Sequence, residues 1–311
     1  MKRYSRRNFV QLLGKGAAAS LLLPTTVLGK EQDLIKLTIL HTNDTHSQIE
    51  PFPLSHKRFG GKGGVLQRKV LIDQVRSMEK NVLLLDAGDI FQGTPYFNMY
   101  KGEVEFRAMS EMKYDAATIG NHDFDNTIEG LDSVLPHASF EFLSANYDFS
   151  NTVLDGKVKP YQVYEREGVR IGVFGVGIEL DSLVPKACYK ETVYEDPIAV
   201  AQTYSRKLKE EELCDVVICL SHLGYQYRGD KVSDIQLAEK TKNIDLIIGG
   251  HTHTFLEEPS KVMNSEGKEV LITQVGFAGI NLGRVDFYFD RKKKRRLAFQ
   301  SDKDWSSTVV V

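Results

Sequence analysis

Acidic, histidine and asparagine residues follow several short apolar stretches of the sequence. The residues concerned are Asp44, His46, Asp89, Asn121, His222, His251 and His253. Imidazole, carboxylate and amide groups without a thiolate are typical ligands of zinc, manganese or iron. Seven such groups exceed the four ligands of a structural zinc site. They suit two divalent ions that share a carboxylate, and such a pair can activate a water molecule against a phosphoryl group.

The spacing within two of these segments bears on which residues share an ion. Asp44 and His46 are two positions apart, so in an extended segment their side chains point the same way and can bind one ion. His251 and His253 have the same spacing, which by itself suggests a second chelating pair. A D-x-H match alone is a weak signal, because it often occurs by chance. The coincidence of five such segments is far stronger.

A further histidine, His122, directly follows Asn121, and we expect its side chain to point in a different direction from that of Asn121. It is therefore free to act as an acid or to stabilise charge. Asp125 follows three residues later and can hold His122 in its protonated form. We expect His122 and Asp125 to form a catalytic pair.

The stretches that precede these segments have the composition of buried strands. They are rich in leucine and β-branched residues and cover 34–40, 81–85, 114–120, 214–220 and 244–248. Helical patterns lie between them, and this alternation predicts parallel βαβ units. Ligands of such sheets bind at the carboxyl ends of the strands. We therefore expect all five polar segments to meet at one rim of an α/β domain.

Two of the intervening helices have clear signals. Asp196 followed by Pro197 is typical of a helix N-cap and first turn. The segment 63–78 has apolar residues close to a single helical stripe. They are Val65, Leu66, Val70, Leu71, Val75 and Met78.

The first 29 residues have the composition of an export signal. A basic start precedes a short apolar stretch, and the segment contains no acidic residue. The stretch is too short to span a bilayer, and SRRNF at 5–9 resembles a twin-arginine signal. We expect 1–29 to direct export to the periplasm and 30–311 to form one catalytic domain. Removal of the signal changes the net charge from −2 to −7, which does not favour a nucleic-acid polymer as partner.

Cysteine usage and one basic run have simple interpretations. The three cysteines cannot all pair with one another, and Cys214 and Cys219 lie in an apolar stretch. We expect these two to be buried free thiols. The basic run 291–296 follows a strand-like segment and is expected to form a solvated hairpin turn.

The order of the polar segments resembles that of the calcineurin-type metallophosphoesterases. The matching motifs are D-x-H at Asp44, G-D at Asp89, G-N-H-D at Asn121, the histidine His222 and G-H-x-H at His251. Over about residues 35–290 the chain is similar to the catalytic domain of bacterial periplasmic 5′-nucleotidases. This resemblance implies a four-layer α/β/β/α sandwich with two central sheets, which the alternation of strands and helices alone does not predict.

The resemblance also implies a role for each motif residue. One metal ion would be held by Asp44, His46, Asp89 and His253, and the other by Asp89, Asn121, His222 and His251. Asp89 would thus bridge the two ions, and His251 and His253 would serve different ions. His122 would contact the phosphate and stabilise the transition state or protonate the leaving group, with Asp125 orienting it.

The resemblance covers one domain of a family that usually has two. The second domain, which binds the nucleobase in that family, is expected to be absent from this sequence, which ends at Val311. We expect a phosphomonoesterase with nucleotides as the leading substrate class, acting alone or with a separately encoded substrate-binding domain. Two other functions stay open: a non-catalytic, metal-stabilised subunit of an envelope complex, and a related thioester or thiosulfate hydrolase. The presence of Asp89, His122 and Asp125 favours the enzyme over the scaffold.

Overall fold

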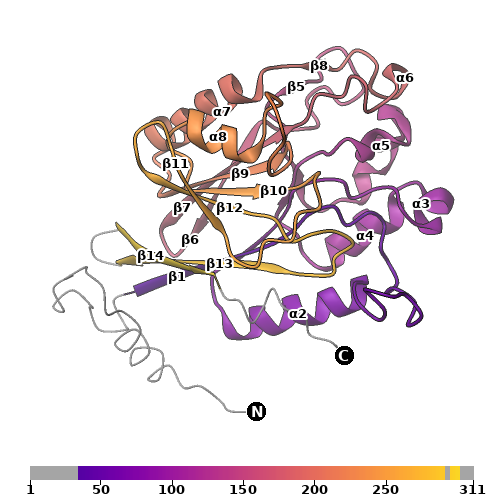
Figure 1. Ribbon diagram of the computed structural model, residues 1–311, viewed down its shortest axis with the longest axis horizontal. Coiled ribbons are helices and arrows are strands. Elements are labelled where there is room, and N and C mark those ends of the chain that lie inside the picture. The colour runs from indigo at the N-terminus through magenta and orange to yellow at the C-terminus, as the bar shows by residue number, and fades with distance from the viewer. Residues whose placement is uncertain (1–33, 291–294, 302–311) are drawn as a thin grey trace. The chain divides into compact units, whose positions relative to one another are not determined.

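Two six-stranded sheets form the centre of the computed structural model, which describes residues 34–290 and 295–301. Figure 1 shows how the strands and helices are arranged. The first sheet has the order β14 (Arg295–Ser301), β13 (Gly283–Asp290), β1 (Leu34–Thr42), β2 (Val82–Asp86), β3 (Ala116–Ala117) and β4 (Glu141–Phe142). The second has the order β11 (Ser260–Met263), β12 (Glu269–Thr273), β10 (Leu246–Gly249), β9 (Val216–His222), β7 (Val169–Gly177) and β6 (Tyr161–Arg166). The expected signal, residues 1–29, lies outside the described residues.

Parallel pairing dominates the middle of each sheet. Strands β1 to β4 run parallel to one another, and so do β7, β9, β10 and β12. Antiparallel strands β6, β11 and β14 lie at edges. A short pair, β5 (Tyr147–Asp148) and β8 (Val193–Tyr194), forms a third sheet. The predicted parallel βαβ arrangement is therefore confirmed, but it is divided between two sheets.

Helices connect these strands. They are α2 (Val65–Met78), α3 (Pro95–Tyr100), α4 (Glu103–Glu111), α5 (Thr127–Val134), α6 (Lys186–Tyr189), α7 (Pro197–Arg206) and α8 (Asp234–Lys240). Other helical turns occur at η2 (His122–Phe124), η3 (Leu135–His137) and η4 (Lys207–Glu211). Asp196 caps α7 as predicted, since its side chain accepts hydrogen bonds from the backbone N–H groups of Ile198 and Ala199.

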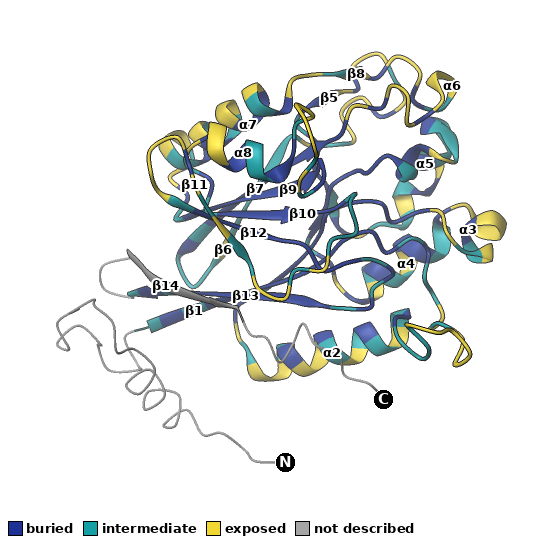
Figure 2. Cartoon of the chain, in the orientation of Figure 1, coloured by how far each residue is buried: buried dark blue, intermediate teal, exposed yellow. Residues whose placement is uncertain are grey.

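Three hydrophobic clusters define four layers. Alternate residues of β2 and β9 point in opposite directions, as side chains of a strand must. Leu83 and Ile218 pack in a cluster between the two sheets. Leu84 packs instead with residues of α2, α4 and α5, and Val217 packs with residues of α7 and α8. The strands are accordingly buried on both faces, whereas the outer surfaces of the helices are exposed (Figure 2). The order helix, sheet, sheet, helix confirms the four-layer α/β/β/α fold.

The predicted apolar face of α2 is partly wrong. Leu66 and Val70 are 78% and 63% exposed, while Arg68, Ile72 and Val75 are buried. An arginine can occupy a core-facing position here because it lies beside the buried Tyr114 hydroxyl and Asp86 carboxylate, which interact with its charge.

Two simpler expectations have clear outcomes. Cys214 and Cys219 are buried free thiols, as predicted. Strands β13 and β14 form the expected antiparallel hairpin, but Arg295 and Arg296 already belong to β14, and residues 291–294 lie outside the described part of the chain.

Candidate metal centre

The five polar segments meet where β1, β2 and β3 of the first sheet and β9 and β10 of the second sheet end. His222 is the last residue of β9, and the other segments follow their strands within a few residues. Backbone hydrogen bonds tie the segments together: Asp44 N donates to Gly88 O (2.9 Å), and His46 N donates to Asp89 O (3.1 Å). The predicted common rim is confirmed, with the difference that two sheets contribute to it.

The backbone at this rim is not extended. Positive φ angles occur at Asp44 (49°), His46 (47°), Asp89 (55°), His251 (70°) and His253 (51°). Non-glycine residues rarely adopt this left-handed conformation, which costs about 1–3 kcal/mol and is concentrated at functional sites. The assumption of an extended segment around Asp44 and His46 is therefore wrong, although the two residues do lie together.

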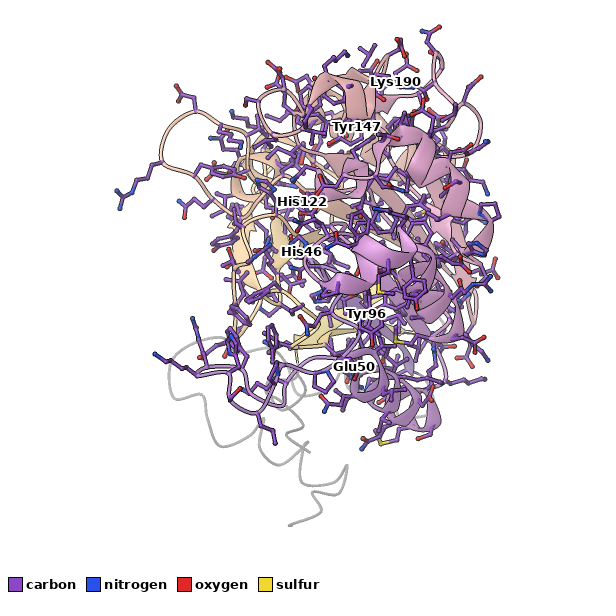
Figure 3. The ribbon with its side chains drawn as sticks, turned by 90° about the vertical axis from the view of Figure 1, so that its right-hand side faces the viewer. His46, Glu50, Tyr96, His122, Tyr147 and Lys190 are labelled. Atoms are coloured by element: carbon purple, nitrogen blue, oxygen red, sulfur yellow. The ribbon has the colours of Figure 1, made fainter. Side chains whose placement is uncertain are left out.

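One donor group consists of Asp44, His46 and His253. Nε2 of His253 lies 3.3 Å from Asp44 Oδ1 and 2.9 Å from His46 Nε2. The rings of His46 and His122 have centroids 5.4 Å apart. Both residues are labelled in Figure 3, where they lie close to each other. The first group thus brings together three of the predicted ligands.

A second donor group consists of Asp89, His222 and His251. Nε2 of His222 lies 3.1 Å from Asp89 Oδ2. Asn121 joins this group, because its Oδ1 atom lies 2.8 Å from His251 Nδ1. His251 and His253 therefore belong to different groups, although their spacing alone suggested a single chelating pair.

The hydrogen bonds of the histidines show that their other ring nitrogens are available to a cation. His46 Nδ1 donates to the Phe91 carbonyl oxygen (3.1 Å), and His222 Nδ1 donates to the Ala87 carbonyl oxygen (2.7 Å). In a neutral ring, Nε2 then carries a lone pair. Burial lowers the pKa of His46, and burial together with the neighbouring His222 lowers the pKa of His251 to about 4. Both rings are therefore neutral near pH 7.

The surroundings of His222 give the clearest test of whether a cation fits. Its Nε2 atom is buried and faces the Asp89 carboxylate, with Oδ2 3.1 Å away. Burial disfavours a charged ring, yet the Asp89 carboxylate raises the pKa of His222 to about 10. A positive charge is thus favoured between these two side chains. A divalent ion supplies that charge and accepts both donor atoms, so the donor set fits a metal.

His122 and Asp125 form the predicted contact. His122 Nδ1 lies 2.8 Å from Asp125 Oδ2. This hydrogen bond raises the pKa of His122, while partial burial opposes the shift and the Asp89 charge reinforces it. The His122 side chain is 39% exposed, so its Nε2 atom can reach a ligand.

Asp123 is the last residue of the G-N-H-D motif, but sequence reasoning assigned it no role, whereas the structure shows that it supports the loops of the centre. Its two carboxylate oxygens accept four backbone hydrogen bonds of 2.8–3.1 Å. The donors are the N–H groups of Asp89, Ile90, Phe91 and Gly120. Asp123 is fully buried and thereby fixes the loops that carry Asp89 and Asn121. Its place within the G-N-H-D motif was the available signal.

Two other polar residues near the rim have structural roles. Asn43 donates to the Gly276 carbonyl oxygen (2.6 Å) and accepts from Val275 N (2.9 Å). Asp86 accepts from Gly88 N (2.9 Å) and from the Thr42 hydroxyl, which favours a strand-end cap over support of a histidine.

Comparisons with known proteins agree with this geometry. Residues 37–255 match the calcineurin-like phosphoesterase family. The chain is 34% identical over 298 residues to the 5′-nucleotidase of Homo sapiens, which covers 89% of this chain and 50% of that protein. It is 34% identical over 278 residues to the snake venom 5′-nucleotidase of Crotalus adamanteus, and this match covers 83% of this chain and 46% of that protein. The chain thus spans about half the length of the curated relatives it matches.

A solved structure supports the same relationship. The crystal structure of a 5′-nucleotidase precursor from Thermus thermophilus has a TM-score of 0.76 and 34% sequence identity, and the match covers 86% of this chain and 54% of that one. Among the described residues, no helix has the length and apolar character needed to cross a bilayer. The matched fold, the matched segment 37–255 and the two donor groups lead to one conclusion: the chain belongs to the calcineurin-like phosphoesterase family.

Proposed function

We propose that this chain hydrolyses phosphoric monoesters, with nucleoside monophosphates as the leading class, at a centre of two divalent metal ions. The position of Asp89 Oδ2 carries the proposal. This single oxygen lies 3.1 Å from His222 Nε2 and 3.9 Å from His46 Nε2, one histidine from each donor group. A carboxylate that bridges two ions must face ligands of both, as Asp89 does here.

The chain offers a ligand set for each ion. One set comprises Asp44, His46, Asp89 and His253, and the other comprises Asp89, Asn121, His222 and His251. When bound, two such ions polarise phosphoryl oxygens and lower the pKa of a water molecule. Nitrogen and oxygen donors without thiolate suit zinc, manganese or iron.

His122 is the proposed catalytic residue of the chain itself. The Asp125 carboxylate orients the ring through Nδ1 and favours its protonated form. Nε2 can then donate a hydrogen bond to a phosphoryl oxygen, or a proton to the departing alcohol oxygen. The backbone N–H of His122 donates to Asp89 Oδ1 (2.8 Å), which ties this residue to the proposed bridge.

A hydrolysis panel tests the proposal. The protein, stripped of metal and reloaded with zinc, manganese or iron, is assayed with an aryl phosphate, a nucleoside monophosphate, a cyclic nucleotide and a UDP-sugar. We expect metal-dependent release of phosphate from the monoesters, and its loss in Asp89→Asn. The proposal fails if no loaded form cleaves any substrate, or if Asp89→Asn leaves the rates unchanged. Inactivity with full metal content would favour a metal-stabilised, non-catalytic subunit.

We also propose that the chain is exported to the periplasm by the twin-arginine route. The support is the composition of residues 1–29, above all the adjacent Arg6 and Arg7. Fractionation of bacterial cells should find the wild type outside the cytoplasm and the double substitution Arg6→Lys, Arg7→Lys inside it. Equal export of both would contradict the route.

A further inference from the structure

A buried glutamine, Gln274, contacts the G-H-x-H loop, residues 250–254, which carries His251 and His253. Gln274 directly follows β12, and its side chain is fully buried. The proposed reaction gives this residue no role. Because a buried amide group needs hydrogen-bond partners, the positions of those partners show what the side chain does.

The Gln274 amide makes three hydrogen bonds to the G-H-x-H loop. Its Nε2 atom donates to the Gly250 carbonyl oxygen (2.5 Å). Its Oε1 atom accepts from the Thr252 hydroxyl (3.0 Å) and from the backbone N–H of Thr254. Gly250 precedes the first histidine of the loop, Thr252 separates the two histidines, and Thr254 follows the second. The amide is therefore bonded on both sides of each histidine.

The chemistry of the partners fixes the orientation of this amide. A carbonyl oxygen can only accept and a backbone N–H can only donate, so Nε2 has to face Gly250 and Oε1 has to face Thr254. Rotation of the amide by 180° would place two acceptors against each other and two donors against each other. Gln274 is thus a specific connection between these two points of the loop.

The loop that Gln274 holds is strained at both histidines. Thr252 N donates to the Gly250 carbonyl oxygen (2.9 Å) across His251, whose φ is 70°. A three-residue turn with a positive φ is rare and strained, and His253 also has a positive φ, of 51°. Such conformations persist only where the surrounding structure fixes them. The Gln274 amide supplies this constraint, because its hydrogen bonds hold the start of the turn and the residue after His253.

Neighbouring hydrogen bonds connect the same support to other ligand segments. Thr252 Oγ1 accepts from Tyr225 N (3.0 Å), which lies in the loop that follows β9. Val275 N donates to the side chain of Asn43 (2.9 Å), the residue that directly precedes the D-x-H motif. Gln274 and its neighbours therefore hold three ligand-bearing segments against the end of β12.

We propose that Gln274 is a positioning residue that sets the separation of the two metal ions by holding His251 and His253 in their left-handed conformations. The inference rests on the proposed function, since it takes these histidines as ligands of different ions. Without the amide the strained loop would relax, and ligands of both ions would move together. Loss of a hydrogen-bonding partner behind a metal ligand typically lowers metal affinity by about 10- to 100-fold.

Manganese binding to a pair of variants tests the inference. Gln274→Met removes the three hydrogen bonds and keeps an unbranched side chain of similar length. The matched control is Asn264→Leu, in the turn between β11 and β12 at the opposite end of β12. The Asn264 side chain is also buried, and its Oδ1 atom accepts two backbone N–H groups (2.9 Å each). Both variants thus lose buried hydrogen bonds, but only Gln274→Met loses them at the metal centre.

Metal affinity is the first measurement. The metal-free proteins are titrated with manganese in a calorimeter, and their melting temperatures are recorded. In Gln274→Met we expect the affinity for both ions to fall by about 10- to 100-fold, whereas Asn264→Leu should bind both ions like the wild type. Thr252→Val removes one of the three bonds and should weaken both sites by a smaller factor, so it provides the test if Gln274→Met does not fold.

Electron paramagnetic resonance of the dimanganese form is the second measurement, because it reports the separation of the ions. Two manganese ions that share a carboxylate are magnetically coupled, and the coupling weakens as they move apart. At full occupancy we expect weaker coupling in Gln274→Met and wild-type coupling in Asn264→Leu. A general loss of stability would not produce this difference.

Each outcome has a separate meaning. Unchanged affinity and coupling in Gln274→Met, or in Thr252→Val if it replaces that variant, would overturn the inference and leave the proposed function standing. Equal losses in Gln274→Met and Asn264→Leu would also overturn it, since a loss shared with the control indicates general destabilisation. Loss of one ion alone would contradict the common support of both sites. If the wild type bound fewer than two manganese ions, the proposed two-metal centre itself would fail.

Discussion

Replacement of Asp123 by asparagine isolates the contribution of one buried carboxylate to the whole centre. The two oxygens of Asp123 accept four backbone N–H groups, two on each oxygen. In the variant, one amide oxygen can still accept two of these N–H groups. The NH₂ group replaces the other oxygen and cannot accept, so two backbone N–H groups lose their acceptor. Each buried donor left without an acceptor costs about 1–3 kcal/mol. Asp123→Asn should therefore lower the free energy of unfolding by about 2–6 kcal/mol, a large part of the usual stability of a domain.

Urea denaturation of the metal-free protein measures this loss. Asp125→Asn is the matched control, because it makes the same chemical change two residues away on a carboxylate that is partly exposed. We expect the control to lose less than about 1 kcal/mol. Metal binding should also weaken in Asp123→Asn, by about 10- to 100-fold, because the loops that carry Asp89 and Asn121 lose their common support.

A specific result would refute the reasoning. If Asp123→Asn unfolded at the same urea concentration as Asp125→Asn and bound metal equally well, the carboxylate could not be acting as a fourfold acceptor. Asp123 would then carry a proton in the wild-type protein, and the loops would depend on other contacts.

Three further predictions concern the catalytic pair and the packing between the sheets. His122→Ala should keep its metal content while kcat falls by about 10²- to 10⁴-fold; loss of metal would instead make His122 a ligand. Asp125 raises the pKa of His122, which keeps the ring protonated to higher pH. In Asp125→Asn the alkaline limb of the kcat profile should therefore move to lower pH, and an unmoved limb would contradict the pairing. A Cβ atom at Gly283 would lie 2.0 Å from His41 Nε2. Gly283→Ala should therefore lower the free energy of unfolding by about 1–3 kcal/mol. An unchanged melting temperature would show that His41 can move aside.

Much of the metal centre could be predicted because each of its segments is recognisable from residues that are neighbours in the sequence. Each metal-ligand candidate ends a strand or follows one within a few residues, so an apolar stretch followed by Asp44, Asn121 or His251 marks a strand end. The parallel arrangement then requires these ends to share a rim. The same logic located His122 and Asp125, which lie on one short helical turn and its cap.

The α2 helix shows where periodicity is insufficient. Its sequence offers several apolar residues at helical spacing, and Leu66 and Val70 fit the predicted stripe. The face that packs on the sheet is nevertheless defined by Arg68, Ile72 and Val75. Apolar spacing identifies a helix, but the direction it faces depends on groups distant in the sequence, here the Tyr114 hydroxyl and the Asp86 carboxylate.

The sequence by itself therefore determined the strands, their polar ends and the types of donor, because these depend on neighbouring residues along the chain. The resemblance of the motifs to those of a known family also assigned each histidine to a group, which the spacing alone did not do. Only the tertiary structure decided how the five strand ends divide between the two sheets and which backbone positions are left-handed. The tertiary structure also decided that Asp123 accepts four backbone hydrogen bonds and that the rings of Phe59, Phe255 and Phe277, from three separate loops, lie in contact. The physical reason is that a metal-binding geometry brings together atoms that are distant along the chain. A motif in the sequence specifies which ligand atoms are available, but it does not specify which of them lie within a few ångströms of one another.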